Sequence, residues 1–189
     1  MNIKDIVKSI DNKRVMDALA LNEISGNKNV ICKFSFAGGI SGYSFGRSQF
    51  DVTNNSFARK FLEEKCEFSK DEIQRLLDLD KNILDLNEKL SKHKQEIDEF
   101  DKKHVVEMIN YVASLENIPE LEDDRVFVHL VDYHNQFNLS RNGKLHTWLK
   151  NKSCITSKDI LYFKLNFTKW GKDQPGDVKR RWSNIEKYY

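Results

Sequence analysis

The segment from Val30 to Val52 constrains the fold most, because it interrupts a chain whose apolar residues otherwise recur at helical spacing. Its first part, residues 30–36, partly alternates and is rich in β-branched and aromatic residues, which predicts a short strand or one arm of a hairpin. Glycines then allow tight backbone turns at positions 38, 39 and 42. We therefore expect a mainly helical α+β chain with one small β element.

A single carboxylate lies just before this segment. Residues 15–21 carry the apolar stripe of a helix, and Glu23 falls where that helix gives way to Ser25 and Gly26. A side chain at such a helix end can face a cleft rather than the core, which makes Glu23 a catalytic candidate. A solvated helix cap is the alternative role of an isolated Glu, and the spacing alone leaves both roles open.

Residues 43–51 combine hydroxyl, aromatic, amide and carboxylate groups, a mixture that suits a sugar. The segment resembles the lysozyme-like superfamily of peptidoglycan glycosidases. In goose-type lysozymes, soluble lytic transglycosylases and several phage endolysins, a catalytic Glu ends a helix and a Ser-aromatic-Gly-x-x-Gln motif opens the next helix. The run from Ser44 to Gln49 corresponds to that motif, although Arg47 and Ser48 replace its usual apolar pair.

The segment also resembles phage-type lysozymes and the pesticin muramidase domain, in which a Glu is followed by a hydroxyl residue and an Asp. Ser44 and Asp51 match those two places. The resemblance implies a lysozyme-like fold for residues 1–189 as a single domain, with the β element beside the cleft. It also implies a muramidase that cuts the β-1,4 bond between N-acetylmuramic acid and N-acetylglucosamine, as a phage endolysin or an antibacterial toxin. No cofactor is expected.

Cleavage of a glycosidic bond needs a carboxylic acid that keeps its proton near neutral pH, and Glu23 is the candidate for this role. Asp51 would orient water, stabilise an oxocarbenium-like transition state, or only cap a helix predicted to begin at Ser48. In the last case one carboxylate remains, as in lytic transglycosylases, where a hydroxyl of the substrate attacks. Ser44 would position water or the N-acetyl group, and Tyr43 and Gln49 would bind sugar.

A second polar run, residues 132–136, follows an apolar segment that we predict to be helical. Tyr133, Asn135 and Gln136 are candidates to line the far wall of a sugar-binding cleft, and an ordinary polar helix face is the alternative. We expect no metal site, because His129 and His134 share no third ligand at a useful spacing.

Apolar residues recur at spacings of three and four from Leu76 to Phe100, a heptad-like run of ~38 Å if it is one helix. Either this seam packs on the protein's own core, in one long helix or two with a bend, or it pairs with another chain. The second alternative gives a different function, a non-enzymatic helical module that oligomerises and binds nucleic acid through its basic ends.

Charge is unevenly distributed, with +4 in residues 1–60, −10 in residues 61–139 and +8 in residues 140–189. The basic ends suit an anionic polymer, either cell wall or nucleic acid. With the muramidase interpretation, we expect a peptidoglycan glycan strand as partner, with an immunity protein or delivery machinery, and neither nucleic acid nor a membrane. The final segment is similar to the closing helix of phage-type lysozymes, which predicts Trp182 and Ile185 in the core and Arg180 and Arg181 on the surface.

Three cysteines, an odd number at no metal-ligand spacing, predict buried free thiols, or one disulfide and a thiol if the protein is oxidised. The N-terminal residues lack an apolar run of signal-peptide length. We therefore expect synthesis in the cytoplasm without a signal peptide. Action on the wall, in the periplasm of a target or host cell, would then require a holin, a secretion machine or lysis.

Overall fold

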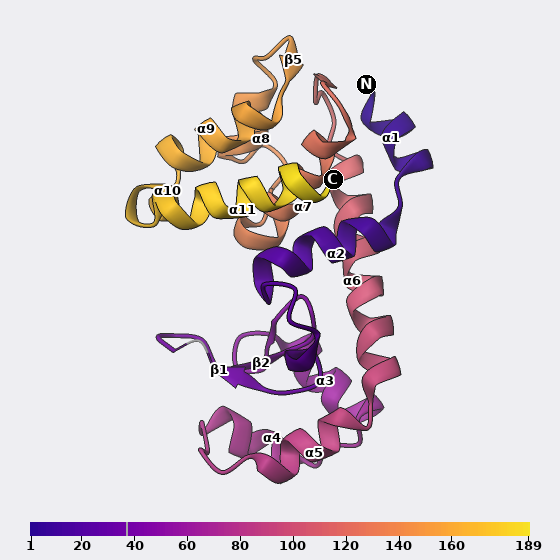
Figure 1. The fold of residues 1–189 in the computed structure, drawn as a ribbon, viewed down its shortest axis with the longest axis vertical. Coiled ribbons are helices and arrows are strands. Elements are labelled where there is room, and N and C mark those ends of the chain that lie inside the picture. Colours follow the sequence, from indigo (N-terminus) through magenta and orange to yellow (C-terminus); the bar gives the residue numbers. More distant parts are fainter. Residues whose placement is uncertain (37) are drawn as a thin grey trace. The chain divides into compact units, whose positions relative to one another are not determined.

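The computed structural model describes residues 1–36 and 38–189 (Figure 1). Most described residues are helical, and the strands form a three-stranded antiparallel sheet and a two-stranded parallel one. The predicted mainly helical α+β class is therefore confirmed. None of the helices in the described ranges is both long and apolar enough to cross a bilayer.

Contacts divide the chain into two compact units where the sequence predicted one domain. Unit 1 comprises Met1–Asn22 and His104–Tyr189, and unit 2 comprises Glu23–Lys103. The chain passes from one unit to the other at the peptide bond after Asn22 and again within helix α6 (Lys94–Ala113).

The sheet of unit 2 has the order β1 (Ser35–Phe36), β2 (Tyr43–Phe45) and β3 (Phe50–Asp51). The strand predicted for residues 30–36 forms only at its end. A 3-10 helix, η1 (Lys28–Val30), precedes it, and its N-cap residue Asn27 accepts a hydrogen bond from the backbone of Asn29. That local bond competes with strand pairing, so the β-branched residues before Ser35 stay outside the sheet.

Helix α3 (Ser56–Lys65) follows the sheet, so the prediction of a helix from Ser48 is wrong. Residues 50–51 pair with β2 instead, and Asn55 caps α3 by accepting from the backbone of Phe57 and Ala58. The helix therefore begins directly after the residue whose side chain caps it.

The apolar seam of residues 76–100 is divided among α4 (Lys70–Leu77), α5 (Leu84–Ser91) and the first part of α6. A capping box, formed by Ser69 with Glu72, starts α4. Leu79 ends the helical path with a φ of 57°. Most seam residues are nevertheless buried, which confirms packing on the protein's own core, whereas Leu79 is exposed and Phe100 is half-buried. Fully buried are Leu76, Leu86, Leu90 and Ile97.

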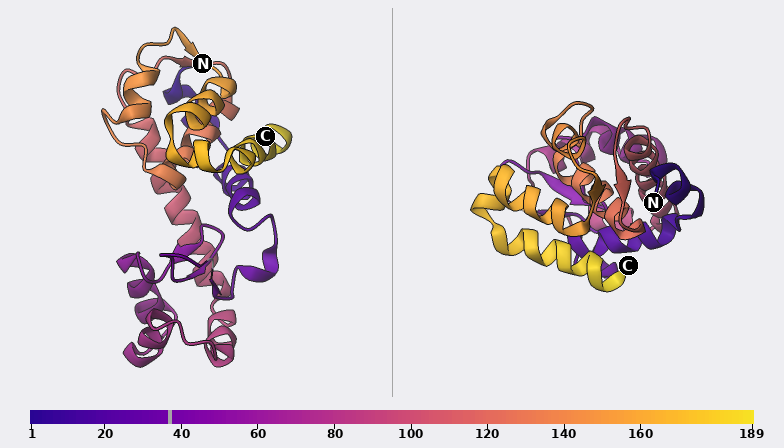
Figure 2. Two further views of the ribbon diagram at one scale, coloured as in Figure 1. Left: turned by 90° about the vertical axis from the view of Figure 1, so that its left-hand side faces the viewer. Right: turned by 90° about the horizontal axis from the view of Figure 1, so that it is seen from above.

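Unit 1 is built around α7 (Asp124–Phe137), whose residues 126–133 are all buried. This confirms the helix predicted for residues 126–131. It is apolar on nearly every side because other elements contact it on several sides. They include α1 (Ile3–Ser9), α9 (Ser157–Phe167), α11 (Pro175–Tyr188) and β4 (Glu120–Leu121), and α9 and α11 lie side by side (Figure 2).

The remaining elements of unit 1 complete this core. They are α2 (Asn12–Glu23), whose last residue belongs to unit 2, together with α8 (Lys144–Leu149), β5 (Cys154–Ile155) and α10 (Lys169–Asp173). In α11, Ile185 is buried as predicted and Arg180 is exposed, but Arg181 is only 5% exposed. The prediction of a surface position for Arg181 is therefore wrong.

The cysteines are free thiols, and burial differs among them. Cys66 is buried, and burial raises the pKa of its thiol to about 12, so that it stays protonated. Cys32 is half-buried and Cys154 is exposed, so the prediction of buried thiols fails for Cys154.

Candidate active site

The strand pairing gives the sheet of unit 2 one polar face. Ser44 lies opposite Ser35 on one side and opposite Asp51 on the other. Residues directly opposite in an antiparallel ladder project from the same face, so these three side chains form a row across all three strands. We call Ser35, Ser44 and Asp51 the polar row.

The other face of the sheet is aromatic. Its side chains come from the alternate positions of the same strands, which explains the pattern of the sequence: every polar residue of the row stands beside an aromatic one. Phe45 is fully buried and packs on Phe50 and Phe61. Because burial of these rings fixes the register, Ser44 and Asp51 are held on the opposite face.

Asp51 is fixed by hydrogen bonds from four donor groups. Its carboxylate accepts from the backbone N–H groups of Gly42, Thr53 and Asn54 and from the Asn54 side chain, at 2.8–3.3 Å. Burial alone would raise the pKa of Asp51, but these hydrogen bonds outweigh it and hold the pKa below its ordinary value. Asp51 therefore stays ionised, and it caps the turn after β3, whereas helix α3 is capped by Asn55.

Gly42 makes room for this arrangement. A Cβ atom at that position would lie 1.9 Å from Thr53 Oγ1 and 2.7 Å from Thr53 Cβ. The backbone of Gly42 approaches the turn after Asp51 closely only because it carries no side chain.

The run from Ser44 to Gln49 forms the end of β2 and the turn into β3. The motif therefore does not open a helix, contrary to the resemblance that suggested it. Gly46 and Gln49 adopt φ angles of 77° and 51°, which close the turn. The side chain of Gln49 accepts from the Ser35 hydroxyl at 2.8 Å and donates to the Gly46 carbonyl at 3.0 Å. Gln49 thus reaches the polar row, where it is hydrogen-bonded to Ser35.

A buried carboxylate from α6 fixes the same turn. Asp101 accepts from the backbone N–H groups of Arg47 and Ser48 at 2.8 and 2.9 Å, and the Arg47 side chain forms an ion pair with Asp98. Burial raises the pKa of Asp101 despite these hydrogen bonds. The polar residues Arg47 and Ser48, which depart from the family motif, are thus explained by contacts with a distant helix.

Tyr43 lies on the aromatic face of the sheet, opposite the polar row, and its role in sugar stacking stays a prediction. Its ring packs against Phe34 and Phe36, with centroid distances of 6.4 and 5.8 Å. Its hydroxyl donates to the Asp80 carbonyl at 2.8 Å. Tyr43 therefore connects the sheet to the segment after α4.

Glu23 is the last residue of α2 and is partly exposed. The chain turns sharply after it, because Ser25 and Gly26 have φ angles of 52° and 70°. The structure thus confirms a carboxylate at the end of this helix, in unit 2 with the polar row.

The residue before Glu23 is held by a buried polar cluster of unit 1. Asn22 donates to Asp132 at 3.0 Å, and its backbone carbonyl accepts from Arg181 at 3.3 Å. Asn184 donates to the Asn22 side chain at 3.1 Å. These bonds fix the C-terminal turn of α2, and hence the backbone from which Glu23 projects.

Asp132 is the centre of this cluster and is fully buried. It accepts from Lys164 and from Arg181, both at 2.7 Å. Burial would raise the pKa of Asp132, but the two cations outweigh it and hold the pKa far below its ordinary value. The sequence does contain a signal for this cluster, since Asp132 follows a run that is apolar except for His129, and Lys164 stands among the apolar residues of α9.

The candidates from the second polar run all lie in unit 1, on α7. Tyr133 is buried and its ring packs on Phe137 at 5.1 Å, whereas Gln136 accepts from Lys164 at 2.8 Å. Tyr133 therefore belongs to the core of unit 1, and half-buried Gln136 hydrogen-bonds to a member of the buried cluster. Their role in sugar binding stays a prediction. Asn135 is half-buried on the same helix.

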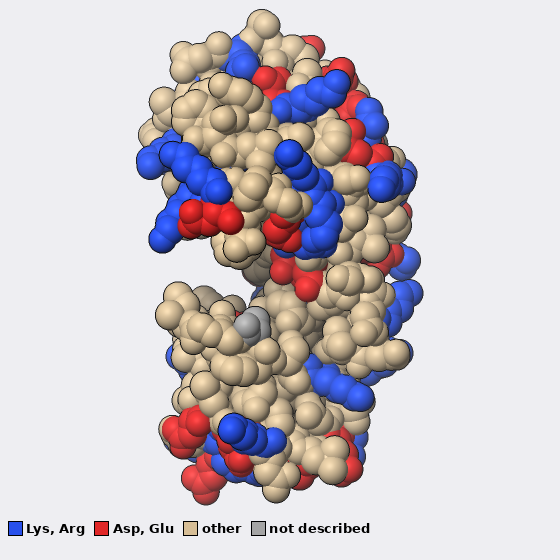
Figure 3. All heavy atoms as spheres, turned by 60° about the vertical axis from the view of Figure 1, so that its left-hand side comes forward, with Lys and Arg blue, Asp and Glu red and all other residues tan. Residues whose placement is uncertain are grey.

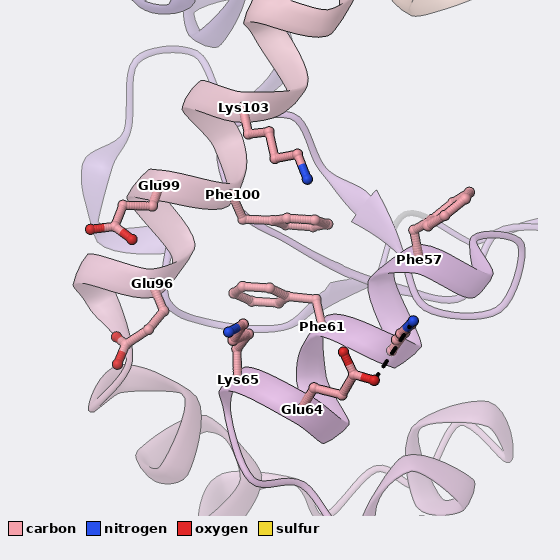
Figure 4. A pocket seen from close by; sticks show the side chains of 9 residues that line it. Phe57, Phe61, Glu64, Lys65, Glu96, Glu99, Phe100 and Lys103 are labelled. Atoms are coloured by element: carbon pink, nitrogen blue, oxygen red, sulfur yellow. Dashed lines mark ion pairs between the residues drawn. The ribbon is translucent and has the colours of Figure 1, made fainter.

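A separate groove of about 540 Å³ lies between α3 and α6 (Figure 4). Phe61 and Phe100 stack at its base with ring centroids 4.2 Å apart, and Phe57 stands at one side. Phe61 and Phe100 contact the aromatic face of the sheet, so the groove lies on the side opposite the polar row. Its rim carries three lysines and three glutamates, Lys60, Glu64, Lys65, Glu96, Glu99 and Lys103.

Within the described ranges no three His, Cys, Asp or Glu side chains gather as metal ligands. Comparison of the chain with family models, with curated proteins and with solved structures finds no match. Glu23 and the polar row are therefore the candidate functional groups among the described residues.

Proposed function

We propose that this chain is a peptidoglycan glycoside hydrolase of the muramidase type, which cleaves the β-1,4 bond between N-acetylmuramic acid and N-acetylglucosamine. The observation that carries the proposal is the pairing of Ser44 with Asp51 on the polar face of a small sheet that follows Glu23. This order, an acid at a helix end and then a hydroxyl and a carboxylate on strands, is the order of the phage-type and pesticin-type enzymes.

In this mechanism Glu23 is the general acid that protonates the leaving oxygen, a role worth ~10² to 10⁴-fold in rate. Such a donor must keep its position during the reaction. The hydrogen bonds of Asn22 to Asp132 and Asn184 support this role, because they fix the helix turn that carries Glu23.

Asp51 acts without forming a bond to the sugar. One of its oxygens accepts from Gly42, Thr53 and Asn54, and the other accepts from Gly42 and Asn54. A carboxylate nucleophile needs a free lone pair, whereas an oriented, ionised carboxylate needs only its charge. We therefore assign to Asp51 the stabilisation of the oxocarbenium-like transition state through its charge, with Ser44 beside it to position the attacking water.

Two alternatives from the sequence have less support. The lytic transglycosylase alternative needed Asp51 to cap a helix that begins at Ser48, whereas residues 44–49 form a hairpin turn and Asn55 caps α3. The oligomerising nucleic-acid module needed a free apolar seam, but Leu86, Leu90 and Ile97 are fully buried. The proposed substrate is the glycan strand of the wall in the periplasm, reached as an endolysin or a toxin.

Digestion of purified Gram-negative sacculi, followed by mass spectrometry, tests the proposal. The wild-type chain should release muropeptides with reducing ends, and Glu23→Gln should release at least about 100-fold less while keeping its thermal unfolding midpoint. Glu64→Gln is the matched control, because Glu64 is an exposed glutamate of unit 2 that pairs with Lys60.

Sacculi left intact by the wild-type chain, or full release by Glu23→Gln, would overturn the assignment. Anhydro-muramyl ends would establish the transglycosylase instead. NMR of the first product anomer and mass spectrometry of the protein test the role of Asp51, since a glycosyl adduct on Asp51 contradicts it.

A further inference from the structure

Three large aromatic side chains form a cluster at the surface of unit 1, in which Trp148 is half-buried and the other two are exposed. They are Trp148 from α8 and Tyr162 and Phe167 from α9, with ring centroids 6.1–6.5 Å apart. Tyr162 is 55% exposed and Phe167 is 48% exposed. We call these three residues the aromatic cluster. Contiguous exposed apolar surface of this kind marks an interaction site more often than scattered single residues do.

The cluster is supported from below by the core. Phe163 is buried and packs on Trp148 and Phe167, with centroid distances of 5.4 and 5.2 Å. Packing on Phe163 therefore fixes the rings of Trp148 and Phe167 in their positions at the surface.

Basic side chains accompany the cluster. Lys152 lies over the Trp148 ring at 4.3 Å, and Lys158 is one helical turn before Tyr162 on the same face of α9. Residues 144–173, which span α8 to α10, contain seven lysines and two aspartates, and of these lysines only Lys164 is buried. Figure 3 shows Lys and Arg side chains gathered over the lower part of unit 1 in that view, with a few carboxylates among them.

We propose that the aromatic cluster and its lysines bind the interface of a membrane that contains anionic phospholipids. Aromatic rings with polar tips suit the boundary between headgroups and acyl chains, and neighbouring lysines attract anionic headgroups. The Trp148 indole N–H and the Tyr162 hydroxyl have no hydrogen-bond partner in the described part of the chain, so both remain available to headgroups and water.

Ring geometry and charge together favour a membrane over a sugar as the ligand. Trp148 and Tyr162 are inclined by only 23° to each other, but the Phe167 ring is inclined by 64° to Tyr162 and by 47° to Trp148. The three rings therefore do not form one flat platform for a sugar, and the neighbouring lysines match anionic headgroups. A lipid interface adapts to such a surface. This binding goes beyond the proposed muramidase activity, and it departs from the expectation of no membrane partner.

Sedimentation of the full chain with vesicles tests the proposal. We expect binding to vesicles of phosphatidylcholine with phosphatidylglycerol, weaker binding as salt is raised, and little binding to phosphatidylcholine alone. Tryptophan fluorescence should shift to shorter wavelength on binding, because Trp148 enters a less polar environment.

Variants locate the surface. Tyr162→Glu, which places a carboxylate in the cluster without removing a buried ring, should weaken binding at least about ten-fold, and Lys158→Glu should weaken it at least about five-fold. Phe57→Ser is the matched aromatic control, because Phe57 is 75% exposed in unit 2. Lys8→Glu is the matched lysine control in unit 1, and neither control should change binding by more than about two-fold.

Failure to bind the anionic vesicles at low salt would overturn the proposal, as would equal binding to phosphatidylcholine alone. If Phe57→Ser lost as much vesicle binding as Tyr162→Glu, the membrane contact would lie outside the aromatic cluster. If Tyr162→Glu instead abolished sedimentation with purified sacculi and left vesicle binding unchanged, the cluster would be a glycan-binding surface. Retention of muramidase activity by Tyr162→Glu keeps this test separate from that of the active site.

Discussion

Ser44 and Asp51 lie directly opposite each other across the β2–β3 ladder, so that a hydroxyl and a carboxylate project from one face of the sheet. The carboxylate is ionised and fully hydrogen-bonded, and the hydroxyl stands between it and Ser35. The predictions below concern this pair, the turn that supports it and the buried cluster that fixes α2.

Asp51→Asn should lower both activity and stability. An amide cannot accept from every donor around this position, and its NH₂ group would meet backbone N–H groups. We expect muropeptide release to fall at least about 100-fold, and the free energy of unfolding to fall by about 1–3 kcal/mol. Asn54→Ala is the control, since it removes one donor and keeps the carboxylate. Equal loss of activity in both variants would indicate a role in structure only.

Gly42→Ala should destabilise unit 2 through a direct clash with Thr53. We expect a loss of about 1–3 kcal/mol in the free energy of unfolding, measured by urea titration. Thr53→Gly removes the two atoms that clash, so the double variant should recover part of the loss. Gly176→Ala is the control, because a Cβ there meets nothing within 4 Å. Absence of any recovery in the double variant would contradict this explanation.

Asp132→Asn should leave two buried cations, Lys164 and Arg181, without their carboxylate. Loss of one partner from a buried ionic cluster costs about 3–5 kcal/mol. Asp177→Asn, which breaks the more exposed pair with Arg180, should cost no more than about 1 kcal/mol. Thermal unfolding of the wild type and the two variants measures these losses of stability. Similar midpoints for Asp132→Asn and Asp177→Asn would contradict a stabilising role of the buried cluster.

Stability should fall in acid partly through Asp51. Its pKa is lowered on folding from an ordinary value of 3.8, so its contribution is complete above that pH and is lost as the pH falls through the folded pKa. Asp132 acts in the same direction. Urea midpoints measured from about pH 5 downward should therefore decline less steeply in Asp51→Asn than in the wild type. Parallel declines would show that Asp51 has the same pKa in both states.

Local patterns in the sequence determined most of the helices. The capping boxes at Ser69 and Thr156 predict helix starts, and the apolar run of residues 126–131 predicts a buried helix. These features need only neighbours within a few residues, since a cap bonds three positions away and a helical stripe repeats every turn. The placement of Glu23 at a helix end came from the same kind of information.

Only the tertiary structure decided which polar groups pair when they are distant in the sequence. The turn at Arg47 and Ser48 is fixed by Asp101, more than fifty positions along the chain, so a segment predicted as a helix start became a hairpin. Arg181 is buried because its guanidinium pairs with the buried carboxylate of Asp132. No local sequence pattern indicates that pairing. Periodicity shows which side of an element is buried, whereas the partner of a buried charge is set by how elements pack.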